Sequence, residues 1–259
     1  MGFYDLSKDE RQKMVKETED NILTAIKDSV DKLDKKLVPK VILDYASDSD
    51  TYIRKNAYMA ISRIYLGHTE LQGKILQILD NMLENPEERV RQTSVYSLGE
   101  IGKKDANSVI KRFERAIKDK HSSVRNAVIG ALKQMGQKNP EPTFNFAKKH
   151  LHDEDPQIRR EIIHGIELRG RTYPGEVLPL LEELQDEKVK EVRNMIVHVI
   201  GQISYKEKCL EKVVNTLKNW HNRELVCDAA KEIIHVHIRY KFAVRSPEYA
   251  ENYIKKHLT

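Results

Sequence analysis

Hydrophobic residues recur three and four positions apart along this chain, with charged residues between them, which predicts amphipathic helices that each bury one face. One such pattern repeats, and its clearest copy runs from Val90-Arg91 to Gly102. Its leading hydrophobic residue recurs at Ile53, Val90, Val124, Ile158, Val192 and Val226. The steps are 37 residues once and 34 residues four times, and a period of this length predicts stacked helical repeats.

Each repeat predicts two antiparallel helices joined by a short polar turn. In one repeat the first helix carries Ile75, Ile78 and Leu79 on one face, and the second helix contains Val90. Four turns have an acidic or amide residue five positions before the leading hydrophobic residue: Asp48, Asn85, Asp119 and Asp153. Such a residue is expected to accept hydrogen bonds from the open amides that begin the second helix.

Both ends of the chain predict capping helices, which cover the outer faces of the terminal repeats. The first, within residues 1–35, begins with a capping box of Ser7 and Glu10. Its hydrophobic stripe is expected to contain Ile22, Ile26, Val30 and Leu33. The last, residues 246–258, begins with Ser246-Pro247. Repeats fill residues 36–240, so we expect a single domain over residues 1–259.

The recurring pattern, Asp-x-x-x-x-Val-Arg-x-x-Ala-x-x-Ala-Leu-Gly-x-Ile-Gly, resembles a HEAT repeat of the variety also seen in phycobilisome lyases. The resemblance covers about residues 36–240, and it departs from the pattern at Cys227, which stands where the arginine is expected. It implies an all-α fold, a right-handed α-solenoid of about six HEAT-like helix pairs. It also implies a concave groove lined by the solvent side of the second helices.

Five arginines follow the leading hydrophobic residues and are called the register arginines: Arg54, Arg91, Arg125, Arg159 and Arg193. A ladder of phosphate-binding cations is one interpretation. The resemblance implies another, in which Asp–Arg bridges tie each repeat to the next. We favour the bridges, because guanidinium groups pair with carboxylates at fixed offsets and motifs of this kind mark the fold.

Helical neighbours four residues apart and repeat neighbours 34 apart define the residues expected in the groove. The candidate binding residues are Lys55, Gln92, Tyr96, Asn126, Arg160, His164, Asn194, His198, Asp228 and Glu232. Amides and a tyrosine suit hydrogen bonding to a peptide backbone or a partner loop. The alternative is an ordinary solvated surface.

Two of these candidates, His164 and His198, occupy the same repeat position and could face each other, with Glu232 one repeat further on. Imidazole and carboxylate groups are zinc ligands, so a metal site is conceivable. We favour exposed histidines instead and predict no metal site and no cofactor.

Composition indicates a helical protein without a membrane segment. Hydrophobic residues make up 39% and charged residues 33% of the 259 residues, and no apolar run approaches the roughly 20 residues that cross a bilayer. Charges within the first twenty residues argue against a signal peptide, so a cytoplasmic location is expected. The two cysteines, Cys209 and Cys227, fit no metal motif, and buried thiols are expected.

The net charge of +5 is unevenly distributed, since residues 101–150 hold 12 Lys and Arg against 4 Asp and Glu. A basic run within this segment is expected mostly on a first helix, on the outer face: Lys103, Lys104, Lys111, Arg112, Arg115 and Lys118. Docking of an anionic partner and simple solvation are alternative interpretations.

Two functions from different classes remain. A non-catalytic scaffold that binds a protein or peptide is favoured, because no nucleophile–base pair or phosphate loop stands out, and no catalytic residue is predicted. The alternative is nucleic-acid binding, since the later half distantly resembles HEAT-like bacterial alkylpurine glycosylases. Their Trp-Asp-x-x-Asp motif is missing, and the single tryptophan, Trp220, precedes His221-Asn222. The His-Glu iron motifs of HEAT-type deoxyhypusine hydroxylases are missing as well.

Overall fold

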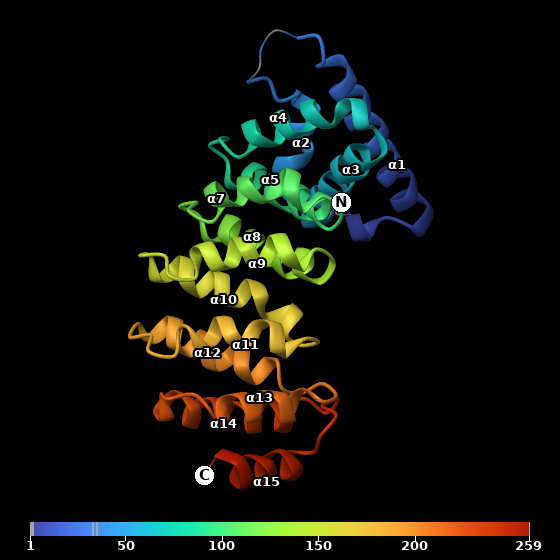
Figure 1. The fold of residues 1–259 in the computed structure, drawn as a ribbon. Helices are drawn as coiled ribbons and strands as arrows, with labels where there is room; N and C mark the ends of the chain where they lie inside the picture. Colours follow the sequence, from blue (N-terminus) through green and yellow to red (C-terminus); the bar gives the residue numbers. More distant parts are fainter. Residues whose placement is uncertain (1–2, 33, 35, 259) are drawn as a thin grey trace. The chain divides into compact units, whose positions relative to one another are not determined.

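The computed structural model describes residues 3–32, 34 and 36–258, and every regular element in these residues is a helix, which confirms the all-α prediction. The chain forms two compact units, Met1–Asn139 and Pro140–Thr259. The helices of the first unit (Figure 1) are η1 (Phe3–Asp5), α1 (Lys8–Asp28), α2 (Lys40–Ser47), α3 (Thr51–Gly67), η2 (Thr69–Leu71), α4 (Gln72–Met82), α5 (Glu88–Gly102), α6 (Ala106–Val109), η3 (Ile110–Arg112), α7 (Phe113–Ala116) and α8 (Ser122–Lys138). Those of the second are α9 (Pro140–His150), α10 (Pro156–Gly170), α11 (Pro174–Glu182), α12 (Lys190–Gln202), α13 (Cys209–Leu217), α14 (Arg223–Arg239) and α15 (Pro247–Leu258).

The first unit is built on the second helices of its repeats, because α3, α5 and α8 pack side by side. A Cβ atom placed on Gly99 would lie 2.7 Å from the Cβ of Ala131, so the motif glycine allows α5 to approach α8 closely. Helix α1 packs on α2 and α3 as the predicted cap, and Ser7 and Glu10 form the capping box.

Two expectations for the first unit are wrong in detail. The stripe of α1 ends at Ile26, because the helix ends at Asp28 and Val30 is 47% exposed, while Leu33 lies outside the described residues. The first helix of the third pair is broken into α6, η3 and α7. Its hydrophobic positions Val109 and Phe113 are nevertheless buried, so periodicity located the buried face although not the break.

In the second unit, α10 packs on α12 and α12 packs on α14, while α11 and α15 both pack on α13 (Figure 1). Helix α15 also packs on α14, which confirms the predicted C-terminal capping helix. Cys209 is buried, but Cys227 is exposed, so the expectation of two buried thiols is wrong for Cys227. This cysteine replaces a register arginine, at a position that faces outward from α14.

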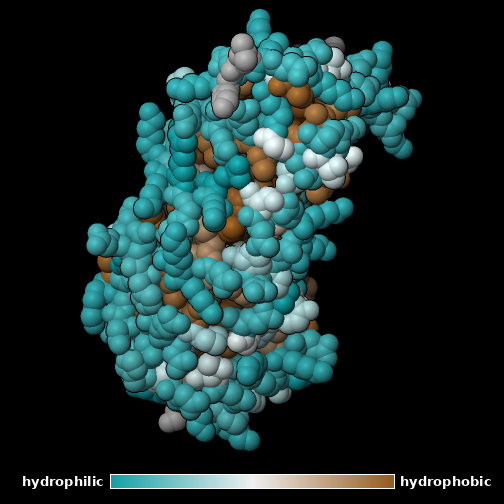
Figure 2. All heavy atoms as spheres, turned by 45° about the horizontal axis from the view of Figure 1, so that its top comes forward, coloured by the Kyte–Doolittle hydropathy of each residue, from teal (hydrophilic) through white to brown (hydrophobic). Residues whose placement is uncertain are grey.

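The surface is mostly hydrophilic on the side shown in Figure 2, where hydrophobic residues appear in narrow recesses between charged and polar ones. The largest buried side chains of the core are Trp220, Tyr65 and Phe113. Among the described residues, each helix is too short or too polar to cross a bilayer. The expectation of one domain over residues 1–259 stays a prediction.

Candidate functional site

Three of the five register arginines, Arg91, Arg159 and Arg193, bond an acid of the next repeat, while Arg54 and Arg125 donate to carbonyl oxygens of the turn before their own helix. Arg91 is 5% exposed, and its Nε and Nη2 atoms donate to the carboxylate of Asp119 at 2.6 and 3.0 Å. Its Nη1 atom donates to the carbonyl oxygens of Asn85 and Pro86, in the turn before α5, at 2.8 and 2.9 Å. Burial works against ionisation of Asp119, but the hydrogen bonds from Arg91 and the amide of His121 hold the pKa of Asp119 below its ordinary value.

The second unit repeats this arrangement. Arg159 donates to both carboxylate oxygens of Glu187 at 2.8 and 3.0 Å and to the carbonyl oxygen of Asp153 at 2.8 Å. Arg91 and Arg159 therefore confirm the bridge interpretation, since bidentate pairs of this kind leave these guanidinium groups committed to the protein itself.

The turn residues act differently from the prediction. The side chains of Asp48, Asn85, Asp119 and Asp153 accept from the amide two residues further on, at 2.7, 2.9, 2.8 and 3.1 Å. They order the turn, and the residue at the N-terminus of the second helix lies two positions later, as Asp50 and Asp155 do. The four side chains differ from the prediction because each forms an Asx turn, a bond to the amide two residues later, and this turn is complete before the second helix begins.

The last register arginine changes partner. The position 28 residues after Arg193 holds His221, whereas the corresponding positions after Arg91 and Arg159 hold acids. Arg193 donates instead to Asp228 at 2.7 Å, and this bond lowers the pKa of Asp228. A predicted groove residue is thus engaged in holding two repeats together.

A groove does lie over the second helices of the first unit. It has a volume of about 480 Å³ and is lined by Lys55, Tyr58, Met59, Tyr96, Gly99, Glu100, Lys103, Gly130, Ala131 and Gln134. Two predicted groove residues, Lys55 and Tyr96, are among them. Tyr58 is an addition that the spacing rule missed, because it lies between the predicted columns on α3.

The two tyrosines form an aromatic surface in this groove. Their ring centroids are 5.2 Å apart, and the rings are tilted by 35°. Burial, with contributions from Glu100 and from the other tyrosine, raises the pKa of Tyr58 to about 12. Burial also raises the pKa of Tyr96, so both hydroxyl groups stay protonated and can donate hydrogen bonds at neutral pH.

Half of the predicted basic run is paired with carboxylates. Lys103 lies 2.6 Å from Glu100, Arg112 bonds both oxygens of Asp80 at 2.7 and 2.9 Å, and Arg115 lies 2.5 Å from Glu84. The exposed members are Arg115, which is paired with Glu84, and Lys104, Lys111 and Lys118. The positive charge of this run is therefore compensated in part, by Glu100, Asp80 and Glu84.

The remaining groove candidates are polar surface residues. Gln92 donates to the carbonyl oxygen of Ser123 at 3.2 Å. Asn126 and Asn194 are exposed, and Arg160 is half-buried. Glu232 lies 3.8 Å from His235 on the same helix.

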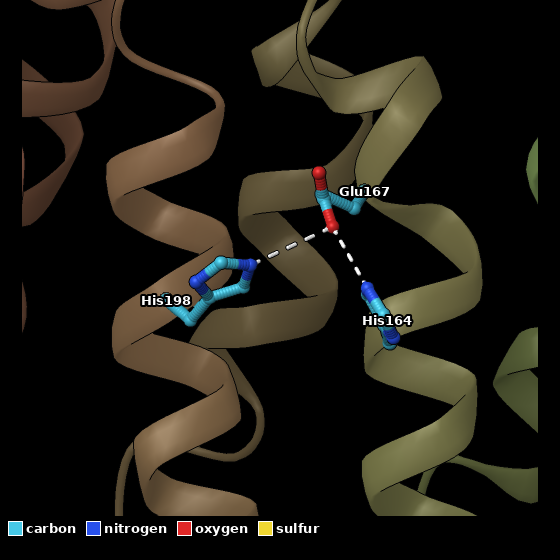
Figure 3. A group of neighbouring side chains, drawn as sticks. All are labelled: His164, Glu167 and His198. Atoms are coloured by element: carbon cyan, nitrogen blue, oxygen red, sulfur yellow. Dashed lines mark ion pairs between the residues drawn. The ribbon is translucent and has the colours of Figure 1, made fainter. Parts of the chain in front are cut away.

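His164 and His198 do face each other across α10 and α12, as their matching repeat positions predicted. Their ring centroids are 6.2 Å apart at 80°. Both rings point at the carboxylate of Glu167, which lies one turn after His164 on α10 (Figure 3). The Nε2 atom of His164 is 3.2 Å from Glu167 Oε2, and that of His198 is 3.8 Å from the same oxygen.

Glu167 takes the place that the sequence argument assigned to Glu232. The three side chains His164, Glu167 and His198 offer ligand atoms that all lie within 4.8 Å of one another. The spacing His164-x-x-Glu167 puts both side chains on one helix face and could have identified the glutamate. It was missed because Glu167 stands among the hydrophobic positions of α10.

Comparison with known proteins finds one family, described as the sister chromatid cohesion protein PDS5 family, which matches residues 40–164, slightly less than half of the chain. No curated protein matches the chain. Among solved structures, a chain of the Pds5–Scc1 complex is 15% identical, with a TM-score of 0.48, over 84% of this chain and 38% of that one. This chain thus spans well under half the length of that relative.

Two further solved structures are similar at comparable levels. The protein smu.31 from Streptococcus mutans UA159 is 19% identical, with a TM-score of 0.46, over 83% of this chain and 98% of its own. A chain of the Kap95:Nup1 complex is 14% identical, with a TM-score of 0.46, over 94% of this chain and 35% of its own. The helix pairs in the described residues, the arginine bridges between repeats and the family match over residues 40–164 together show a HEAT-like helical-repeat fold.

Proposed function

We propose that this protein is a non-catalytic scaffold that binds a protein or peptide partner in the groove over α3, α5 and α8. The observation that carries the proposal is the 480 Å³ hollow itself, which lies where the repeat pattern expected a groove and contains Lys55 and Tyr96. Grooves of this size with aromatic walls and a few polar groups are typical binding sites.

The chemistry of the lining fits an extended peptide. Tyr58 and Tyr96 provide rigid aromatic area with protonated hydroxyl groups, and tyrosine is among the residues that contribute most at protein interfaces. Gly130 on α8 lies beside the Tyr96 ring and has no side chain, so a peptide can approach α8 closely. Gln134 and Lys55 lie in the same lining and offer donors for peptide carbonyl groups or an acidic side chain.

Nucleic-acid binding has less support. Lys103 in the lining is paired with Glu100 at 2.6 Å, and phosphate binding depends on cations that are free to replace counterions. Trp220, the single tryptophan, is 1% exposed and thus cannot stack on a base in its present position.

The test is selection of peptides from a random displayed library against the intact chain, followed by affinity measurement for variants. We expect Tyr96→Ala to weaken the selected peptides about 30-fold, the effect of losing an interface hot spot of about 2 kcal/mol. Tyr58→Ala should act in the same direction. The matched control is Tyr249→Ala, which removes an exposed tyrosine from α15. Circular dichroism of each variant verifies the fold.

Two results would overturn the proposal. Selected peptides that bind Tyr96→Ala and Tyr58→Ala as tightly as the unchanged chain would show that the groove is not the binding surface. Tight binding of a fluorescent DNA duplex, with an affinity that falls steeply between two salt concentrations, would favour the nucleic-acid alternative.

A further inference from the structure

We propose that His164, Glu167 and His198 form a binding site for a divalent transition-metal ion, with zinc as the probe, that links α10 to α12. This site is separate from the peptide groove, since it lies on helices of the second unit and uses different chemistry. It also goes against the sequence-based expectation of simply exposed histidines.

The donor atoms are the right kind and number. Two imidazole nitrogens and one carboxylate oxygen form a His₂Glu set, one of the ligand sets that hold zinc in proteins with a fourth position left for water. Imidazole and carboxylate together suit zinc and its first-row neighbours better than magnesium or calcium, which prefer oxygen alone.

The donor atoms also converge. Metal–ligand distances of about 2.0–2.2 Å in a tetrahedral site place the ligand atoms about 3.4 Å from one another. Here Oε2 of Glu167 lies 3.2 Å from Nε2 of His164 and 3.8 Å from Nε2 of His198, and no pair of the three ligand atoms is more than 4.8 Å apart. The adjustment needed is at most about 1.5 Å, within reach of a small rotation of a half-exposed imidazole ring.

The carboxylate is held in place from its other side. Glu167 is 1% exposed, and Arg171 donates to its Oε1 atom, which leaves Oε2 directed at the two imidazoles (Figure 3). Arg171 also donates to Oε1 of Gln202 at 3.0 Å, and the hydroxyl of Tyr240 donates to the same oxygen at 3.0 Å. Outer hydrogen bonds of this type fix the orientation of metal ligands and are part of most metal sites.

An ion can reach the site. The side chains of His164 and His198 are 31% and 39% exposed, so the open coordination position faces water while Glu167 closes the buried side. An ordinary histidine–glutamate ion pair involves one histidine, as in the contact of His235 with Glu232 at 3.8 Å. Here two histidines from different helices approach one carboxylate oxygen, the arrangement that a shared ion would use.

The test is titration of the metal-free full-length chain with Zn²⁺ against a chromophoric chelator, and with Co²⁺ followed by visible absorption. We expect one equivalent of either ion to bind and Co²⁺ to show the intense visible bands of a four-coordinate site. His164→Ala and His198→Ala should each weaken Zn²⁺ binding at least about ten-fold. Loss of a residue that only hydrogen-bonds a metal ligand already costs about that much, and these substitutions remove a ligand itself. Glu167→Gln should do the same while keeping the shape of the side chain.

The matched control is His235→Ala, which removes an exposed histidine that lies beside a glutamate on α14 of the same unit. It should leave Zn²⁺ affinity and the Co²⁺ spectrum unchanged. Circular dichroism checks the fold of each variant, and the variants of the two half-exposed histidines remain informative even where Glu167→Gln fails to fold. Absence of stoichiometric binding, or Zn²⁺ binding that survives both histidine substitutions, would overturn the proposal without bearing on the peptide groove.

Discussion

Replacement of Arg91 by alanine tests the idea that the register arginines hold the repeats together. The substitution removes both hydrogen bonds to Asp119 and both bonds to the turn before α5. The side chains of Arg91 and Asp119 are only 7% and 12% exposed, so the remaining carboxylate is left poorly solvated. Breaking a buried ion pair from one side costs about 3–5 kcal/mol. The amide of His121 still bonds Asp119, so we expect the lower end, about 3 kcal/mol.

Urea denaturation followed by far-ultraviolet circular dichroism measures this loss. For a slope of about 2 kcal/mol/M, a loss of about 3 kcal/mol lowers the midpoint of the transition by about 1.5 M urea. The matched control is Arg115→Ala, which breaks a pair with Glu84 in the same unit whose side chains are 53% and 58% exposed. Its midpoint should hardly move, because exposed pairs contribute little.

The pH dependence gives a second check with a definite sign. The pKa of Asp119 lies below its ordinary value of 3.8 in the folded chain, so the bridge stabilises the fold fully above pH 4–5 and is lost as the pH falls through the lowered pKa. The difference in unfolding free energy between the unchanged chain and Arg91→Ala should therefore be constant near neutrality and shrink in acid. A midpoint shift for Arg91→Ala no larger than that for Arg115→Ala would refute the structural role of the register arginines.

Three further predictions concern packing, backbone strain and a buried histidine. Gly99→Ala should destabilise the chain by about 1–3 kcal/mol in the same urea assay, because the new methyl group would lie 2.7 Å from the Cβ of Ala131. Gly130→Ala is the control, since its methyl group meets no atom nearer than 3.9 Å, and it should stabilise α8 by about 0.5–1 kcal/mol. Lys208 has a φ of 62°, a left-handed conformation that glycine adopts without strain. Lys208→Gly should therefore increase the free energy of unfolding by about 0.5–1 kcal/mol and raise the thermal midpoint. An unchanged or lower midpoint would contradict this prediction. Burial lowers the pKa of His237, so the stability that its neutral form gives is present above the ordinary pKa of 6.5 and is lost as the pH falls below it. His237→Phe should therefore reduce the loss of stability between pH 7.5 and 5.5. The fluorescence of Trp220, which lies in the same unit, measures the unfolding transition.

The sequence was sufficient to predict most of the helices, because each repeat must bury one face against its neighbours and the spacing of hydrophobic residues records that face. Val90 and Val192 are both buried, as their shared position requires. The breaks in the third pair were not predictable in the same way, since Val109 and Phe113 keep helical spacing while the backbone between them changes to a 3₁₀ turn. Hydrophobic periodicity records burial and is insensitive to such local changes of hydrogen bonding.

The candidate sites were predictable only in part. Repeat position placed His164 opposite His198 and placed Tyr96 in a groove, because both relations depend on the regular stacking of second helices. The same rule missed Glu167, whose contact depends on one turn of α10 together with the bond to Arg171. Pairing of the basic run was also hidden, because partners such as Asp80 come from the preceding repeat.

The partner change of Arg193 affects the electrostatic surface of the second unit. Asp228 would count as a solvent-facing negative charge in any tally made position by position along the repeats, yet its carboxylate is neutralised by a guanidinium from the helix beside it. An approaching molecule therefore meets a dipole at α14 where the repeat alignment suggests a lone anion. The histidine at position 221, where Arg91 and Arg159 meet an acid in their own repeats, thus goes together with a neutralised aspartate on the next helix.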